Sequence, residues 1–268
     1  MENLYLRDFV EFYKNLGVTN VVLYDNNDKN GEYPQQVIGD YISNGYVIYK
    51  DVRGKHRCQI ESYTNCYKEY GDDYDWLLFF DVDEFVELYE DDDINSFLSR
   101  PKFDDADCIF IYWVQYGDSG LLHYDNRPVW ERFTEHVNQY LNESNTFKLM
   151  VRGKTGLDIS FFDANAFTFT KKEGVNITVK NTAGEDVTEE YPYQYWCYDF
   201  AALAHYQTLT VDEFLCRRFG RRSYADNASS FNKETIMNIF YSVCERTEEK
   251  DKIINEFLSK FDLEEDNV

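Results

Sequence analysis

The fold of this chain is decided by the stretch Trp76-Leu77-Leu78-Phe79-Phe80-Asp81-Val82-Asp83-Glu84-Phe85. So apolar a run is typical of a strand buried on both faces. The carboxyl end of such a strand is where an open α/β sheet binds its ligands. Because unpartnered carboxylates are costly to bury, Asp81 and Asp83 favour a bound cation. Their Asp-X-Asp spacing suits Mg²⁺ or Mn²⁺, which prefer oxygen ligands and can bridge to a diphosphate.

Around this stretch, helical and strand periodicities alternate along the chain. The pattern predicts helices at 4–16, 34–44 and 57–70, and strands at 18–24, 46–49 and 76–80. Gly17 follows the first helix directly, as a C-terminal cap does. This alternation is typical of a parallel sheet with crossover helices. Further along, we expect a strand at 108–114 and helices at 94–99, 210–219, 233–246 and 248–260.

The composition restricts the classes of function. The chain has 268 residues, is 43% hydrophobic and carries a formal net charge of −23. Such acidity argues against nucleic-acid binding and against unaided docking on anionic lipid, and its plainest role is solubility. No apolar run approaches the length of a membrane span, and the first residues lack a basic signal region. We therefore expect a cytoplasmic protein without a transmembrane segment.

The cysteines stand alone in the sequence. They form no Cys-X-X-Cys pair, and the four histidines do not cluster with them. This pattern argues against a zinc site and predicts reduced, mostly buried thiols.

Acidic residues follow three apolar strands. Asp25 ends the first, Asp51 the second, and Asp81 with Asp83 the third. Because parallel strands end at one edge of a sheet, these carboxylates predict a polar site for a cation and a hydroxyl-rich ligand. Helix capping is the alternative role for each of them. The segment 25–28 lacks the glycine and terminal glutamate spacing of an EF-hand.

Basic residues supply candidates for binding an anion. Arg53 follows the second strand, where it suits either a phosphate or the solvated surface. The densest basic cluster is Arg217, Arg218, Arg221 and Arg222, which points to an anionic ligand in so acidic a chain. His205 ends the apolar run 200–204 and is either a core residue or a metal ligand.

Several blocks together resemble the family 2-like and family 92 glycosyltransferases of bacterial surface-polysaccharide clusters. These blocks are Glu2-Asn3-Leu4-Tyr5-Leu6, Leu23-Tyr24-Asp25-Asn26-Asn27, the stretch 76–85, the segment 113–120 and His205-Tyr206-Gln207-Thr208 with Glu213-Phe214. The resemblance covers roughly residues 2–225 and includes Gln59 in the helix after the second strand. Asp-X-Asp alone is a weak signal, but the blocks in this order are a strong one.

The resemblance implies a GT-A fold, which is a Rossmann-like mixed α/β sheet with flanking helices, and a nucleotide-sugar donor. It assigns the metal, Mn²⁺ or Mg²⁺, to Asp81, Asp83 and His205. The predicted nucleotide-sugar contacts are Asp25, Asn26, Arg53, Gln59, Asp81, Arg218 and Arg221. A catalytic base must activate the acceptor hydroxyl. Asp118 is the candidate, with Asp199 and Glu84 as rivals and turn capping as the other role for Asp118.

The chain departs from the family pattern at its start. Family members carry a strand before the first helix, and Met1 stands about where that strand ends. We therefore expect the usual first strand to be missing and two strand edges to be exposed, which weakens the donor site.

These observations predict a metal-dependent hexosyltransferase that uses a nucleotide sugar, expected to be UDP-linked. Its acceptor would be a glycan or lipid-linked glycan in lipopolysaccharide or capsule synthesis, with the enzyme free in the cytoplasm or peripheral at the inner face of the membrane. One alternative is a catalytically weakened remnant that binds a nucleotide or sugar. Another is a metal-dependent phosphohydrolase or nucleotidyltransferase. We expect a glycosyltransferase domain over 1–225 and a helical extension of it over 226–268.

Overall fold

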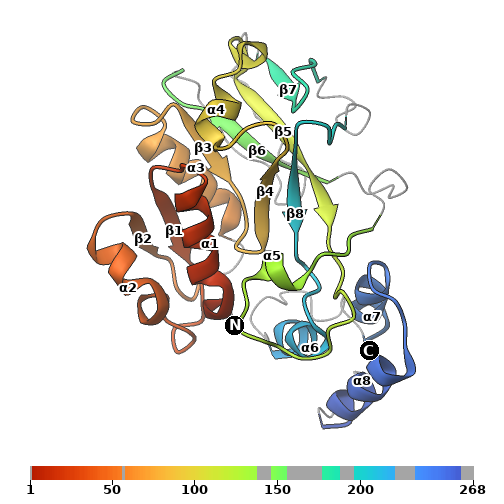
Figure 1. The fold of residues 1–268 in the computed structure, drawn as a ribbon. Coiled ribbons are helices and arrows are strands. Elements are labelled where there is room, and N and C mark those ends of the chain that lie inside the picture. The colour runs from red at the N-terminus through yellow and green to blue at the C-terminus, as the bar shows by residue number, and fades with distance from the viewer. Residues whose placement is uncertain are drawn as a thin grey trace, which may run out of the picture. The chain divides into compact units, whose positions relative to one another are not determined.

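The computed structural model describes residues 2–55, 58–137, 146–155, 177–187, 196–220 and 233–260. It is a mixed α/β protein with flanking helices, consistent with the predicted GT-A-like fold (Figure 1). Two compact units divide the chain. The sheet unit comprises Glu2–Val114 and Gln139–His205, and the helical unit comprises Gln115–Asn138 and Tyr206–Val268. The predicted domain boundary at residue 225 lies outside the described residues and stays a prediction.

The sheet unit contains two sheets. In the first, β1 (Val21–Asp25) pairs with β2 (Val47–Asp51) in parallel, and Asp25 lies opposite Asp51. The second has the order β3-β6-β5-β8-β4, with β7 (Val179–Asn181) paired to β5. Its strands are β3 (Trp76–Phe79), β4 (Glu84–Leu88), β5 (Cys108–Gln115), β6 (Phe147–Arg152) and β8 (Ala201–His205). The helices of this unit are α1 (Asn3–Asn15), α2 (Gln35–Ser43), α3 (Gln59–Tyr70) and α4 (Ile94–Leu98), with a 3₁₀ turn at Pro101–Phe103.

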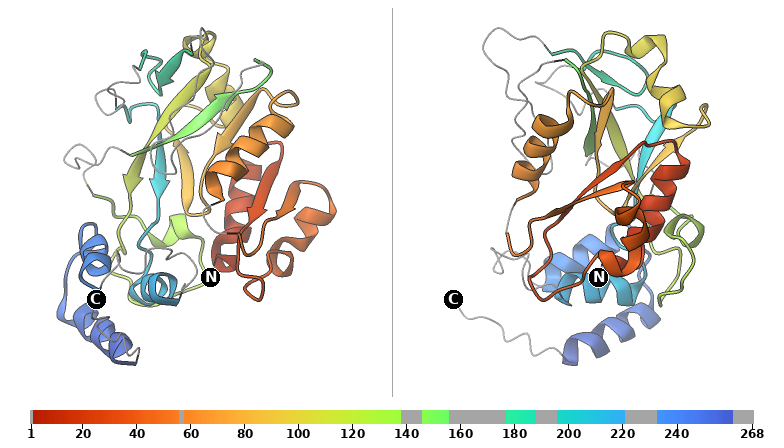
Figure 2. Two further views of the ribbon diagram at one scale, coloured as in Figure 1. Left: turned by 180° about the vertical axis from the view of Figure 1, so that it is seen from behind. Right: turned by 90° about the vertical axis from the view of Figure 1, so that its left-hand side faces the viewer.

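Helix α1 follows from the predicted periodicity. Its buried side chains lie three and four residues apart, so they share one face: Tyr5, Leu6, Phe9, Val10 and Tyr13. Gly17 adopts a φ of 93° after the last turn, the left-handed conformation that ends many helices. The rings of Phe9 and Tyr13 pack on Phe85 of β4. Figure 2 shows α1 and α3 on opposite sides of the strands β1 and β2.

The predicted parallel sheet is correct for β1 and β2 and wrong for β3. Strand β3 pairs with β6 in antiparallel fashion, and among the described residues it has no partner in the first sheet. The prediction that β3 is buried on both faces is also wrong, because Leu77 and Phe79 are buried while Trp76 and Leu78 are only half-buried. The expectation of a missing first strand and two exposed strand edges stays a prediction.

The segment after β3 turns back at once into β4. Glu84 N donates to Asp81 O at 3.0 Å, which closes a tight turn around Asp81-Val82-Asp83. Strand β4 then pairs with β8 in antiparallel fashion, in a register that sets Glu84 opposite His205. This register brings the end of β8 to the Asp-X-Asp turn, although their positions in the sequence are far apart.

The helical unit contains α5 (Val129–Arg132), α6 (Val211–Gly220), α7 (Lys233–Tyr241) and α8 (Glu248–Lys260). Its core is a cluster contributed by α6, α7 and α8 and the chain after α7: Val211, Phe214, Leu215, Phe240, Cys244, Ile254 and Leu258. The three longer helices confirm the prediction of a helical C-terminal segment.

None of the helices in the described part of the chain has the length and apolar character that a bilayer crossing requires. The cysteines are free, and Cys58, Cys66, Cys108 and Cys244 are buried, as predicted.

Candidate functional site

The centre of the candidate site is a buried pair of Asp83 and His205. Asp83 Oδ2 lies 3.8 Å from His205 Nε2, and the two side chains are 8% and 5% exposed. The imidazole also packs against the indole of Trp113, with ring centroids 4.1 Å apart. The indole Nε1 of Trp113 is buried without a hydrogen-bond partner among the described residues. A carboxylate, an imidazole and an orphaned N–H donor therefore lie close together on β5, β8 and the turn after β3.

Asp81 lies in the same turn but has other partners. Its Oδ1 accepts hydrogen bonds from Gln59 Nε2 at 2.9 Å and Tyr63 Oη at 3.2 Å. Its Oδ2 accepts from Lys148 Nζ at 2.6 Å. The side chain of Asp81 is nevertheless 41% exposed. The predicted site residues Gln59 and Asp81 are thus brought together, and α3 and β6 hold the exposed carboxylate in place.

Glu84 completes this network from inside the protein. Its side chain is fully buried, with Oε1 3.4 Å from Lys148 Nζ and Oε2 accepting from Asp81 N at 2.8 Å. Burial raises the pKa of Glu84 well above its ordinary value, and the charge of Lys148 opposes this rise. Such a position suits support of the Asp-X-Asp turn, and the role of Glu84 as a rival base stays a prediction.

The predicted nucleoside and phosphate contacts Asp25 and Arg53 bind each other. Asp25 Oδ2 accepts from Arg53 Nη1 at 3.0 Å and from Tyr49 Oη at 2.8 Å. The Arg53 guanidinium also donates to carbonyl oxygens of the loop between β1 and α2, at Asp28 and Glu32. The pair therefore ties this loop to the end of β2. Asn26, next to Asp25 in the sequence, is half-buried.

The predicted basic cluster is only partly described. Arg218 lies on α6 with its guanidinium carbon 5.6 Å from the centroid of the Phe214 ring. Arg221 lies outside the described residues. Both roles in binding a diphosphate stay predictions.

Asp118, the candidate base, lies in a turn of the helical unit. Its Oδ2 is 2.6 Å from Lys250 Nζ, and the two side chains are 4% and 3% exposed. Its Oδ1 accepts from Gly120 N at 3.0 Å, which is the turn-capping bond that the sequence left open as an alternative. Asp199, the rival acid, lies in the sheet unit and is exposed.

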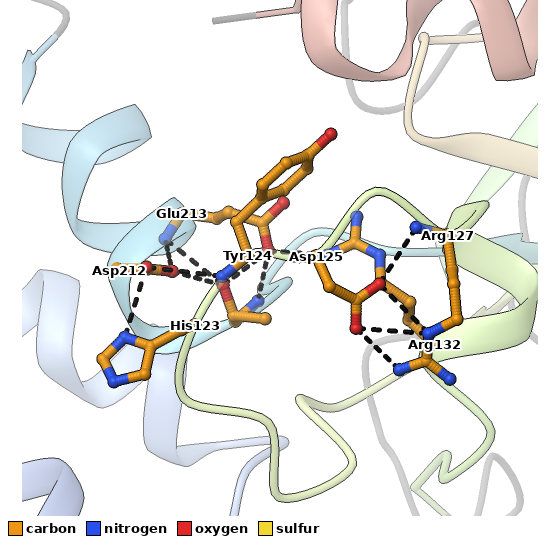
Figure 3. Close-up of polar contacts among 8 residues, drawn as sticks. His123, Tyr124, Asp125, Arg127, Arg132, Asp212 and Glu213 are labelled. Atoms are coloured by element: carbon orange, nitrogen blue, oxygen red, sulfur yellow. Dashed lines mark hydrogen bonds and ion pairs between the residues drawn. The ribbon is translucent and has the colours of Figure 1, made fainter.

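Figure 3 shows a second polar network of the helical unit, at the start of α6. Glu213 Oε2 accepts from Arg132 Nη1 at 2.9 Å, and the two side chains are 2% and 1% exposed. Thr210 Oγ1 also bonds to Glu213, and Asp212 accepts from the backbone N of Tyr124. Glu213, in the Glu-Phe block of the sequence, therefore has a structural role, because it neutralises the buried guanidinium of Arg132.

Sequence reasoning missed Lys148 and Arg132. Lys148 stands within the apolar strand 147–151, and a lone lysine in such a run is the signal that could have marked it as the partner of a buried acid. Arg132 gives no comparable signal, because it follows Glu131 and does not stand within a continuous apolar run.

The donor atoms at Asp83 and His205 fit a divalent cation such as Mn²⁺, which accepts carboxylate and imidazole ligands. Within the described residues, no group of three or more His, Cys, Asp or Glu side chains is arranged to hold a metal ion. The difference from the predicted set is Asp81, whose carboxylate is directed to Lys148, Gln59 and Tyr63. Two of the three predicted ligands are thus in contact, and the third is held beside them.

The fold and this site define a mixed α/β protein with an acidic turn between β3 and β4. The sequence profile of glycosyltransferase family 92 matches residues 2–183, and the chain belongs to this family. A comparison with curated proteins found no match. The chain is thus a glycosyltransferase by family membership.

Proposed function

We propose that this glycosyltransferase is metal-dependent and moves a hexose from a UDP-sugar to a glycan or lipid-linked glycan. The observation that carries the proposal is the buried Asp83–His205 pair beside the half-exposed Asp81, in a member of family 92. The setting that we propose is lipopolysaccharide or capsule synthesis at the cytoplasmic face of the membrane.

Asp83 and His205 would hold Mn²⁺ or Mg²⁺, with Asp81 directed at the donor. When bound, such an ion neutralises the charge that develops on the diphosphate leaving group. Trp113 fixes the plane of the imidazole and offers its buried N–H to a ligand oxygen. Lys148, Gln59 and Tyr63 keep the Asp81 carboxylate in one orientation, which lowers the entropy lost when a donor binds.

Asp118 is our candidate for the base that takes the proton of the acceptor hydroxyl. A positioned carboxylate is the usual group for this step in a transferase that inverts the anomeric carbon. Arg218 and Arg221 would steady the diphosphate after the bond breaks.

A thermal-shift screen tests the donor site. UDP, UDP-glucose and UDP-galactose are added with Mn²⁺ or with EDTA, and a ligand at 100 times its Kd stabilises the folded state by about 2.7 kcal/mol. We expect stabilisation that depends on Mn²⁺ and falls at least tenfold in apparent affinity in Asp83→Asn and His205→Ala. The matched control is Asp75→Asn, because the Asp75 side chain is 83% exposed. Unchanged Mn²⁺-dependent binding of UDP in Asp83→Asn would refute the proposed site.

A second candidate function is a sugar- or nucleotide-binding remnant. Two observations favour it, because Asp25 is bound by Arg53 and Asp81 by Lys148, so two predicted donor contacts have internal partners. Mn²⁺-dependent UDP binding without release of UDP from any UDP-hexose and acceptor tested would support the remnant. Release of inorganic phosphate from UDP-sugars would instead indicate a phosphohydrolase.

A further inference from the structure

We propose that a pocket in the helical unit binds a saccharide that is uncharged or carries an amine, and that it excludes acidic and phosphorylated sugars. The inference rests on the proposed function in one respect, because it assigns this saccharide as the acceptor class of the transferase. The pocket itself is defined by residues of the helical unit alone.

The pocket has a volume of about 440 Å³. Small-molecule sites span roughly 300–1,000 Å³, so a sugar unit is within its range. Its walls are the turn 117–120, the segment 135–137 and the connection from α7 into α8 at 243–250. Gly117 fits against this connection only without a side chain, because a Cβ there would lie 2.6 Å from Val243 O. The wall is therefore a close backbone contact rather than a loose loop.

A buried ion pair forms part of the lining. Lys250 Nζ forms an ion pair with Asp118 Oδ2 at 2.6 Å and donates a hydrogen bond to Glu245 O at 2.8 Å. An ammonium group has three N–H donors, and among the described residues Glu245 O is the acceptor to which Lys250 Nζ makes a hydrogen bond. A buried donor without an acceptor is unfavourable, and a ligand hydroxyl oxygen would satisfy it. The pair thus offers a sugar both a donor at Lys250 and an acceptor at Asp118.

Ser119 adds a hydroxyl to the same lining. Its Oγ accepts two backbone hydrogen bonds, from Thr134 N at 2.9 Å and from Glu135 N at 3.0 Å. With both acceptor positions used, the hydroxyl hydrogen remains available to donate to a ligand. Ser119 also has a φ of 48°, which is uncommon for a residue other than glycine and tends to mark functional turns.

The charge of the lining selects the ligand class. Asp118, Glu135, Glu245 and Glu249 are acidic, against Lys250 and the imidazole of His136. An excess of carboxylates repels phosphate and uronic acid groups, accepts hydrogen bonds from hydroxyls and attracts an amine. Cys244 supplies no further anion, because burial raises the pKa of its thiol to about 11.

Saturation-transfer NMR on the full chain tests the inference without donor or metal. The probes are methyl glucoside, methyl galactoside, glucosamine, glucuronic acid and glucose 6-phosphate, each at ~10 mM, ten times a millimolar Kd. We expect binding of at least one of the first three and at least fivefold weaker binding of the two anionic probes. The double variant Glu245→Gln/Glu249→Gln should reduce that discrimination at least fivefold. Glu256→Gln on the same helix, outside the pocket lining, should leave it unchanged.

The outcomes separate this inference from the proposed function. Absence of binding by every uncharged and amine sugar, or equal discrimination in the double variant and the wild type, overturns the pocket assignment. Mn²⁺-dependent UDP binding is measured on the same samples. Saccharide binding that depends on Glu245 and Glu249, in a protein that binds no nucleotide, supports the pocket and refutes the transferase. Nucleotide binding and hexose transfer without saccharide binding support the transferase and refute the pocket.

Discussion

Replacing Lys148 by methionine tests the buried network that supports the Asp-X-Asp turn. Lys148 and Glu84 are 1% and 0% exposed, with Nζ and Oε1 3.4 Å apart, so solvent screens this pair very little. Removing one partner of a buried ion pair costs about 3–5 kcal/mol when the other partner remains charged. When the remaining carboxyl takes up a proton, the loss approaches that of an unsatisfied hydrogen bond, about 1–3 kcal/mol.

The loss of stability in Lys148→Met should therefore depend on pH. The folded-state pKa of Glu84 is already raised by burial, so its favourable contribution is complete below the unfolded pKa and declines as pH rises through the folded pKa. Without Lys148 that folded pKa rises further. The difference in unfolding free energy between variant and wild type should then grow as pH rises above the wild-type pKa of Glu84, by at most ~1.4 kcal/mol per pH unit.

Urea denaturation at several pH values between about 5 and 9 measures this difference in unfolding free energy. Glu84→Gln in the Lys148→Met background should remove the added pH dependence, because glutamine has no proton to exchange. Lys154→Met is the control, since Lys154 is 52% exposed and its pair with Asp75 contributes at most about 1 kcal/mol. The reasoning is refuted if the variant and the wild type differ by the same amount at every pH.

Three further changes have outcomes that a thermal or urea melt can check. Glu213→Ala leaves the buried guanidinium of Arg132 without its counter-ion and should cost about 3–5 kcal/mol, whereas a loss under 1 kcal/mol would mean that Arg132 finds another partner. Gly153→Ala places a Cβ against the carbonyl oxygen of Tyr74 and should lower the free energy of unfolding by at least about 1–3 kcal/mol. A neutral result would contradict the close approach of Gly153, which follows β6, to the loop that contains Tyr74. Asp93→Ala removes the N-cap of α4, where its Oδ1 accepts two backbone N–H groups, and should cost about 1 kcal/mol, while Asp93→Asn should retain most of the stability.

The local elements of this fold were predictable from the sequence. Helix α1 lies within one residue of its predicted span, and β2 and α3 within two, because each has its own periodicity and end signals. The pairing of strands was not predictable in the same way. The partner of β3 is β6, a strand far along the chain, and no local pattern specifies a register between distant strands. The assumption of one parallel sheet failed at this point.

The same limit applies to the candidate site. Asp81, Asp83 and His205 carry signals of their own, as acids or an imidazole at the ends of apolar runs. Lys148 reaches Asp81 across 67 positions of sequence through the β3–β6 pairing, so its role follows from a register that the sequence pattern does not reveal. Composition alone could not predict that the predicted nucleoside contact Asp25 has Arg53 as its internal partner.

The two acids of the Asp-X-Asp turn differ in exposure, and this difference separates their proposed roles. Asp83 is 8% exposed beside His205, whereas Asp81 is 41% exposed beside Lys148. A half-exposed carboxylate with one internal cation can exchange that partner for a ligand at little cost, because water still solvates part of its charge. A buried carboxylate such as Asp83 has little water to replace a bound cation, so a cation that it holds contributes more to binding. Asp83→Asn should therefore abolish metal-dependent binding of UDP while Asp81→Asn weakens it, and calorimetric titration of both variants against UDP and Mn²⁺ decides the order. Equal losses in the two variants would mean that both carboxylates bind the ion directly.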